Sequence, residues 1–125
     1  MKKNPLKEKS FLFALSIVGL YKTLTQEQKE YVMSKQLLRS LRSATSVGAN
    51  IREALNAQSK KDFIHKLSIS QKEADESLYW LELLVASGYL THDIYSKYVK
   101  DGTEVLKLLK SIILSSKLNS KIKPY

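Results

Sequence analysis

The chain has 125 residues, 43% of them hydrophobic and 26% charged, which suits a single globular domain with its own core. It has no cysteine, which excludes disulfides, thiolate zinc sites and cysteine nucleophiles. The net charge of +9 comes from the two ends, because residues 1–22 hold five lysines and one glutamate while residues 97–125 hold seven lysines and two acidic residues. No stretch reaches the roughly 20 apolar residues that span a bilayer, and the N-terminus lacks the pattern of a signal peptide. We therefore expect a cytoplasmic protein.

Apolar residues recur at helical spacing along nearly the whole chain, and the only two prolines lie near its ends. The predicted helices span about residues 6–24, 26–57, 60–87 and 91–118, followed by a basic tail at 119–125 that we expect to fray. Thr25 resembles the start of the second helix, with Glu27 in its first turn. Ser59 and Thr91 are predicted N-caps of the third and fourth helices, and Gly88 is a natural stop for the third.

Four long amphipathic segments joined by short connections leave antiparallel neighbours as the simplest arrangement. The sequence therefore predicts an all-α domain, an antiparallel up-down-up-down four-helix bundle spanning residues 1–125.

A line of polar residues runs along the second predicted helix at steps of three or four residues, beside an apolar line. It consists of Gln36, Arg39, Ser43, Ser46, Asn50 and Glu53. The third predicted helix offers Lys66, Glu73 and Glu76 on one line. A fold-back near residues 57–58 places Arg39 near Glu76, Ser43 near Glu73, and Asn50 or Glu53 near Lys66. We interpret these residues as a polar seam that sets the register of the two helices. An alternative in which Arg39 and Asn50 contact a ligand stays open.

Residues for catalysis are sparse. Di-iron bundles need two carboxylate-x-x-His elements, and the chain has only one, Asp62 with His65; its other histidine, His92, has no such partner. No serine lies in a glycine-flanked elbow and no glycine-rich phosphate loop occurs. We predict no metal site, no cofactor and no enzymatic activity.

The densest apolar segment includes Tyr79 and Trp80, which are adjacent and diverge by about 100° around a helix. Both cannot face one core, so we consider them candidates for a subunit interface, where large aromatic residues concentrate. The alternative is that one of them covers its own bundle while partly exposed. The fourth predicted helix has apolar residues on more than one side as well, which favours self-association.

The ordered combination of these features resembles a known bacterial family, the four-helix-bundle proteins named for 23S rRNA intervening sequences. The resemblance rests on Gln36-x-x-Arg39, Ser43-x-x-Ser46-Val47-x-x-Asn50-Ile51-x-Glu53, Asp62-Phe63, Lys72-Glu73-x-x-Glu76 and Tyr79-Trp80-Leu81-x-Leu83-Leu84. It covers most of residues 8–115. Ala54 departs from the pattern, because many members have glycine there.

This resemblance implies an antiparallel four-helix bundle that assembles into rings, commonly homopentamers. A similar protein, the accessory variability protein of diversity-generating retroelements, forms a basic pentameric barrel that binds nucleic acid and a reverse transcriptase. By analogy of fold and charge, we hypothesise a non-enzymatic homo-oligomer whose lysine-rich surface binds RNA or DNA non-specifically through phosphates. The candidate residues are Lys3, Lys7, Lys9, Lys22, Lys100, Lys107, Lys110 and Lys117. The alternatives are a protein–protein adaptor with a solubilising charge and, less favoured, a protein of anionic membrane surfaces.

Overall fold

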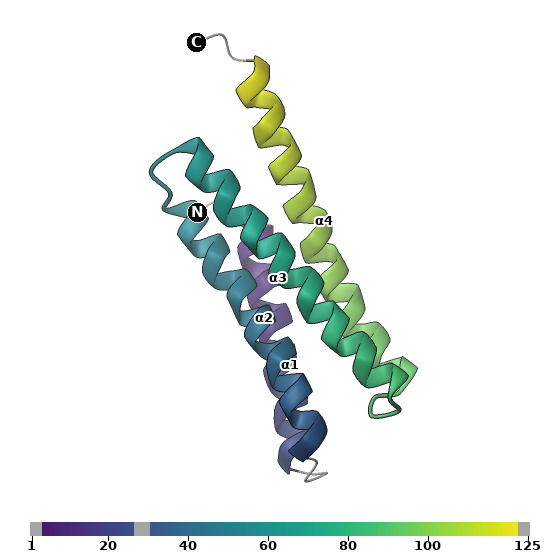
Figure 1. Ribbon diagram of the computed structural model, residues 1–125. Helices are drawn as coiled ribbons and strands as arrows, with labels where there is room; N and C mark the ends of the chain where they lie inside the picture. Colours follow the sequence, from purple (N-terminus) through teal and green to yellow (C-terminus); the bar gives the residue numbers. More distant parts are fainter. Residues whose placement is uncertain (1–3, 27–30, 123–125) are drawn as a thin grey trace.

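The computed structural model describes residues 4–26 and 31–122, and for residues 24–26, 31–34, 36, 37 and 120–122 it describes the backbone alone. Four helices follow one another, with bounds α1 Pro5–Gln26, α2 Tyr31–Leu55, α3 Lys60–Ala86 and α4 His92–Ile122. Figure 1 shows them running up and down in turn, with short connections from α2 to α3 and from α3 to α4. The predicted all-α, up-down-up-down four-helix bundle is confirmed.

The ends of α3 and the start of α4 follow the local signals in the sequence. Ser59 Oγ accepts a hydrogen bond from the backbone N–H of Asp62 at 3.1 Å, and Thr91 Oγ1 accepts one from the backbone N–H of Ile94 at 3.2 Å. These side chains satisfy N–H groups that have no partner inside the helix. Gly88 has a φ of +83°, a left-handed conformation that glycine adopts without steric cost. Both predicted N-caps and the predicted stop are therefore present.

Two predicted boundaries are wrong. Thr25 does not begin the second helix, because it lies inside α1, which continues through Gln26. Glu27, which the sequence pattern places in the first turn after Thr25, lies outside the described residues. At the other end, α4 continues through residues 119–122, which the sequence pattern assigns to a fraying tail. No proline or glycine follows Leu118 within the described residues, so α4 runs on to Ile122.

Each helix packs against two neighbours: α1 and α3 both contact α2 and α4, and within the described residues the backbones of diagonally opposite helices do not come close. The core between them is filled by fully buried apolar side chains. These include Phe13, Ile17, Val47, Ile51, Leu67, Leu81, Leu84, Val105 and Leu109. Among the described residues, no helix has an apolar stretch long enough to cross a membrane.

The contact between α2 and α3 is made by buried serines as well as apolar residues. Ser40 Oγ donates to the carbonyl oxygen of Ser77 and Ser77 Oγ donates to that of Ser40, both at 3.0 Å. One heptad away, Ser70 Oγ donates to the carbonyl oxygen of Val47 at 2.9 Å. Small hydroxyl side chains let the two backbones approach while each of these buried hydroxyls keeps a partner. This contact fixes the register of α2 against α3.

Candidate functional site

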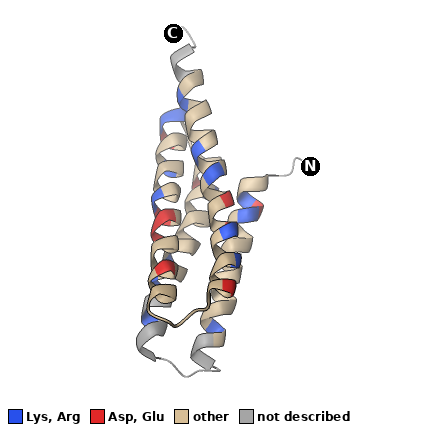
Figure 2. Cartoon of the chain, turned by 90° about the vertical axis from the view of Figure 1, so that its right-hand side faces the viewer, with Lys and Arg blue, Asp and Glu red and all other residues tan. Residues whose placement is uncertain are grey.

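The two basic ends of the chain come together, because α1 and α4 pack side by side. Figure 2 shows basic residues on the helix that begins at the N-terminus and on the helix that leads to the C-terminus. Of the eight candidate lysines, Lys3 lies outside the described residues. The other seven are exposed: Lys7, Lys9, Lys22, Lys100, Lys107, Lys110 and Lys117.

Four of these lysines form a stripe on α4. Lys100, Lys107, Lys110 and Lys117 follow steps of 7, 3 and 7 residues, which at about 100° per residue confines them to roughly a quarter to a third of the helix circumference. The stripe runs over about 17 residues, or roughly 25 Å at 1.5 Å per residue. A phosphate backbone lying along α4 could contact several of them in succession.

Lys9 has a partner that sequence patterns did not identify. Its Nζ lies 2.6 Å from Oε2 of Glu104, an ion pair that joins α1 to α4. The hydrogen bond and the charge of Glu104 raise the pKa of Lys9, and the same contacts with Lys9 lower the pKa of Glu104. Both groups are exposed, so the pair is accessible to competing ions. Lys9 is therefore less available to a phosphate than a lysine of the α4 stripe.

The predicted polar seam divides into two parts. At its C-terminal end, Lys66 Nζ lies 3.6 Å from Glu53 Oε1, which joins α3 to α2. Asn50 makes a local contact instead, because its side-chain amide donates to the carbonyl oxygen of Ser46 at 2.9 Å within α2. The side chain of Gln36 lies outside the described residues.

The N-terminal part of the seam lines an open hollow of about 380 Å³ on the outer side of α2 and α3. Its walls are formed by Arg39, Arg42, Ser43, Ser46, Glu73, Glu76 and Trp80. The residues expected to be neighbours, Arg39 with Glu76 and Ser43 with Glu73, thus share one hollow. Within the described part of the chain, Arg42 forms no ion pair with the two glutamates.

Trp80 connects this hollow to the predicted interface candidates. The guanidinium carbon of Arg39 lies 5.1 Å from the centroid of the Trp80 ring, a cation–π distance. Tyr79 meets the same ring edge to face, with centroids 5.3 Å apart and planes inclined by 69°. As their spacing predicts, the two aromatics diverge: Tyr79 is exposed and Trp80 is half-buried. The indole Nε1 is shielded from solvent without a hydrogen-bond partner among the described residues.

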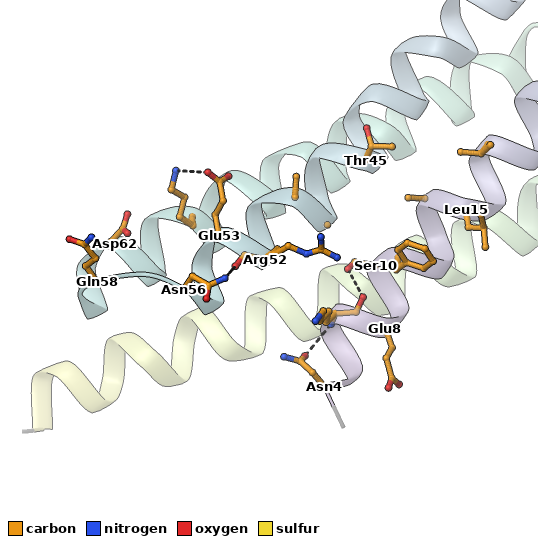
Figure 3. Close-up of a pocket in the computed structure, with 17 residues that line it drawn as sticks. Asn4, Glu8, Ser10, Leu15, Thr45, Arg52, Glu53, Asn56, Gln58 and Asp62 are labelled. Carbon is orange, nitrogen blue, oxygen red and sulfur yellow. Dashed lines mark hydrogen bonds and ion pairs between the residues drawn. The ribbon is translucent and has the colours of Figure 1, made fainter. Parts of the chain in front are cut away.

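A second, larger hollow was not anticipated. It is a groove of about 1090 Å³ between α1 and α2 that reaches the start of α3. Figure 3 shows Leu15 of α1 and Thr45 of α2 on its two walls and Arg52 extending from α2 toward α1. The repeated apolar residues of α1 were a signal for it, because they occur on more sides of the helix than one core can bury.

Over residues 4–26 and 31–122, the structure brings no group of three or more histidine, aspartate and glutamate side chains together as metal ligands would be. His65 and His92 are both exposed, on α3 and at the start of α4.

The arrangement defines a class: a small antiparallel four-helix bundle with exposed lysines along its terminal helices and a serine-lined contact between the central pair. The model of one family, described as 23S rRNA-intervening sequence protein, matches residues 2–111. The chain belongs to this family, as its motifs indicated.

The chain is similar to a protein of unknown function from the S23 ribosomal protein family of Bacteroides thetaiotaomicron, with 58% sequence identity and a TM-score of 0.79. The match covers 86% of this chain and 97% of that one. No curated protein matches the chain.

Proposed function

We propose that this protein is a non-enzymatic, homo-oligomeric four-helix bundle that binds RNA or DNA non-specifically through its lysine-rich surface. The observation that supports this proposal most strongly is the packing of α1 against α4, which brings the two basic helices next to each other. The number of subunits proposed is five, as the family resemblance implies. A reverse transcriptase is a further proposed partner, by the same resemblance.

The α4 stripe is the centre of the proposed surface. Each lysine that neutralises a phosphate releases a condensed counterion, so affinity falls as salt rises. For duplex DNA the slope of log affinity against log salt is about −0.9 per contact. Several copies in one assembly would present several stripes to one strand and gain avidity from that.

The second candidate function, a protein–protein adaptor, is favoured by the cluster of Arg39, Tyr79 and Trp80. Arginine, tyrosine and tryptophan carry much of the binding energy in protein interfaces. In this alternative the lysines contribute only to solubility, and the partner binds on α2 and α3.

Fluorescence anisotropy of labelled RNA and duplex DNA, measured over a salt series, tests the proposal. The decisive variant replaces Lys100, Lys107 and Lys110 by glutamine together. If all three contact phosphates, the salt slope becomes shallower by about 2–3, and affinity near 0.1 M salt falls by at least about tenfold.

A matched control replaces the exposed Lys60, Lys61 and Lys72 of α3 by glutamine, which removes the same charge from another helix. The control should retain most of the affinity, whereas a purely global charge effect would lower both variants equally. The molecular mass of each variant in solution is measured in parallel. A change in oligomeric state is then distinguished from a change in nucleic-acid affinity. If neither nucleic acid binds the wild-type protein at about 50 mM salt, the nucleic-acid proposal is wrong.

A further inference from the structure

Helix α1 exposes three large apolar side chains on the side that faces away from its own core. Phe11, Leu12 and Leu15 are 61%, 59% and 53% exposed. The core face of the same helix is already complete, with Phe13 and Ile17 fully buried. Single exposed apolar residues are ordinary, but three within two turns form a continuous patch, and such patches mark interaction sites. We call Phe11, Leu12 and Leu15 the outward face of α1.

The outward face continues into the groove between α1 and α2, since Phe11 and Leu15 belong to both. The opposite wall is formed by the small side chains of Thr45, Gly48 and Ala49. Along α1 the groove extends from Asn4 to Val18, which at 1.5 Å per residue is roughly 21 Å, or about four helical turns. A long groove with an apolar wall and a wall of small residues suits an amphipathic helix.

The last turns of α4 have the complementary character. The helix has 31 residues, compared with 22, 25 and 27 in the other three, and Figure 1 shows its C-terminal end projecting beyond them. Toward this end of α4, Leu114 is 60% exposed and Leu118 is 48% exposed. They are four residues apart and so share one face, with Lys110 and Lys117 beside them. We call residues 110–118 the α4 extension; its inner side still packs in the bundle, where Ile113 is buried.

The α4 extension cannot occupy the groove of its own chain. Helix α4 packs against α1 and α3, and over the described residues its backbone does not come close to that of α2. Helix α4 continues without a break to Ile122, so these residues cannot turn back to lie between α1 and α2 of the same chain. Any such contact must therefore come from a second copy.

We propose that the outward face of α1 and the adjoining groove bind the α4 extension of a second copy of this chain. Leu114 and Leu118 would pack on Phe11 and Leu15, and lysines of the extension would lie near the carboxylate of Glu8, which is exposed one turn before Phe11. The groove also contains three basic residues, Lys7, Arg52 and Lys66, which would repel the lysines of the extension. The charge of Lys66 is offset, because Lys66 is paired with Glu53.

The two surfaces are different patches, so each copy offers one of each and the contact can repeat from copy to copy. This inference rests on the homo-oligomer of the proposed function and names the surface and the segment that build it.

Mixing two variants tests the contact. One variant carries Phe11→Ser with Leu15→Ser, and the other carries Leu114→Ser with Leu118→Ser. The wild type should have the mass of several chains, and each variant alone should fall to the 14.3 kDa of one chain by light scattering. An equimolar mixture should form a heterodimer and nothing larger, because it keeps one intact groove and one intact extension per pair. Ile94→Ser, which changes another exposed apolar residue of α4, serves as the control and should leave the mass unchanged.

Cross-linking gives a second readout that is independent of serine's effect on folding. The chain has no cysteine, so single variants Leu15→Cys and Leu118→Cys introduce one thiol each. Under oxidation the mixture should form 15–118 disulfides in preference to 15–15 or 118–118 disulfides.

An oligomer that persists in both serine variants and lacks the 15–118 cross-link overturns this inference and leaves the proposed function intact. A monomeric wild type overturns the inference together with the homo-oligomer, while nucleic-acid binding is judged separately by anisotropy.

Discussion

Gly102 lies where α4 meets α1 and α3, at a point too close for an additional methyl group. A Cβ at this position would lie 2.7 Å from Leu78 Cδ2 and 3.1 and 3.2 Å from two ring carbons of Phe13. Favourable carbon contacts lie at about 3.5–4.0 Å. The end of Leu78 can rotate away, but the Phe13 ring is fully buried and held on all sides. We therefore expect Gly102→Ala to force a local displacement.

The magnitude follows from two opposing terms. Alanine is favoured over glycine inside a helix by about 1 kcal/mol, whereas inserting a methyl group into a packed core costs about 1–3 kcal/mol. Gly19 provides the matched control, because it is also within a helix and a Cβ added there would have nothing within 4 Å. Gly19→Ala should stabilise the protein by about 0.5–1 kcal/mol. The difference in unfolding free energy between the two variants isolates the cost of crowding, about 1–3 kcal/mol.

Urea unfolding followed by circular dichroism measures this difference, at one protein concentration at which both variants have the same mass. Gly102→Ala should have the lower midpoint of the two. Equal midpoints would refute the reasoning, because they would mean that α4 can move away from α1 and α3 without loss of packing.

Two further predictions concern contacts on the surface. The ion pair between Lys9 and Glu104 lowers the pKa of Glu104 from 4.5 and raises the pKa of Lys9 from 10.5. Its contribution to the stability of the fold is therefore complete between pH 4.5 and pH 10.5. This contribution is lost as pH falls through the lowered pKa of Glu104, or as pH rises through the raised pKa of Lys9. The difference in urea unfolding midpoint between the wild type and Glu104→Gln should be constant from about pH 6 to 9 and should vanish in strong acid. A difference that persists at about pH 2 would show that the ion pair is not its cause. Trp80 is the only tryptophan, and Arg39 covers its ring, so Arg39→Ala should shift the fluorescence emission to longer wavelength, whereas Arg42→Ala should not. No shift in either variant would show that the cation–π contact does not persist in solution.

Sequence patterns predicted the fold because its signals are local. A hydroxyl at Ser59 or Thr91 caps the helix that follows it, and Gly88 permits the turn that precedes α4. Thr25 shows the limit of such signals. It has the residue type of an N-cap, but the chain around it continues α1, and a cap forms only where the preceding backbone leaves the helix.

The position of the polar residues depends on packing that periodicity does not encode. Antiparallel pairing about the α2–α3 connection brings Glu53 close to Lys66, and simple counting along two helices could anticipate that. The hydrogen bonds of Ser40 and Ser77 could not be anticipated in the same way, because serine marks neither a buried nor an exposed face. Similarly, Leu15 counts as apolar in any pattern, and only the position of α2 and α4 decides that it faces outward.

The α4 extension belongs to both proposals, and this links them. Lys110 and Lys117 lie beside Leu114 and Leu118, so a copy that seats these leucines in its neighbour's groove brings the two lysines to the edge of the contact. Lys100 and Lys107 lie nearer the N-terminus of α4 and stay outside it. In an assembled protein the phosphate contacts should therefore depend more on Lys100 and Lys107 than on Lys110 and Lys117, whereas in the monomeric Leu114→Ser, Leu118→Ser variant all four should contribute. Single glutamine substitutions at these lysines, measured by anisotropy in both backgrounds, distinguish a surface that is reshaped by assembly from one that is merely repeated by it.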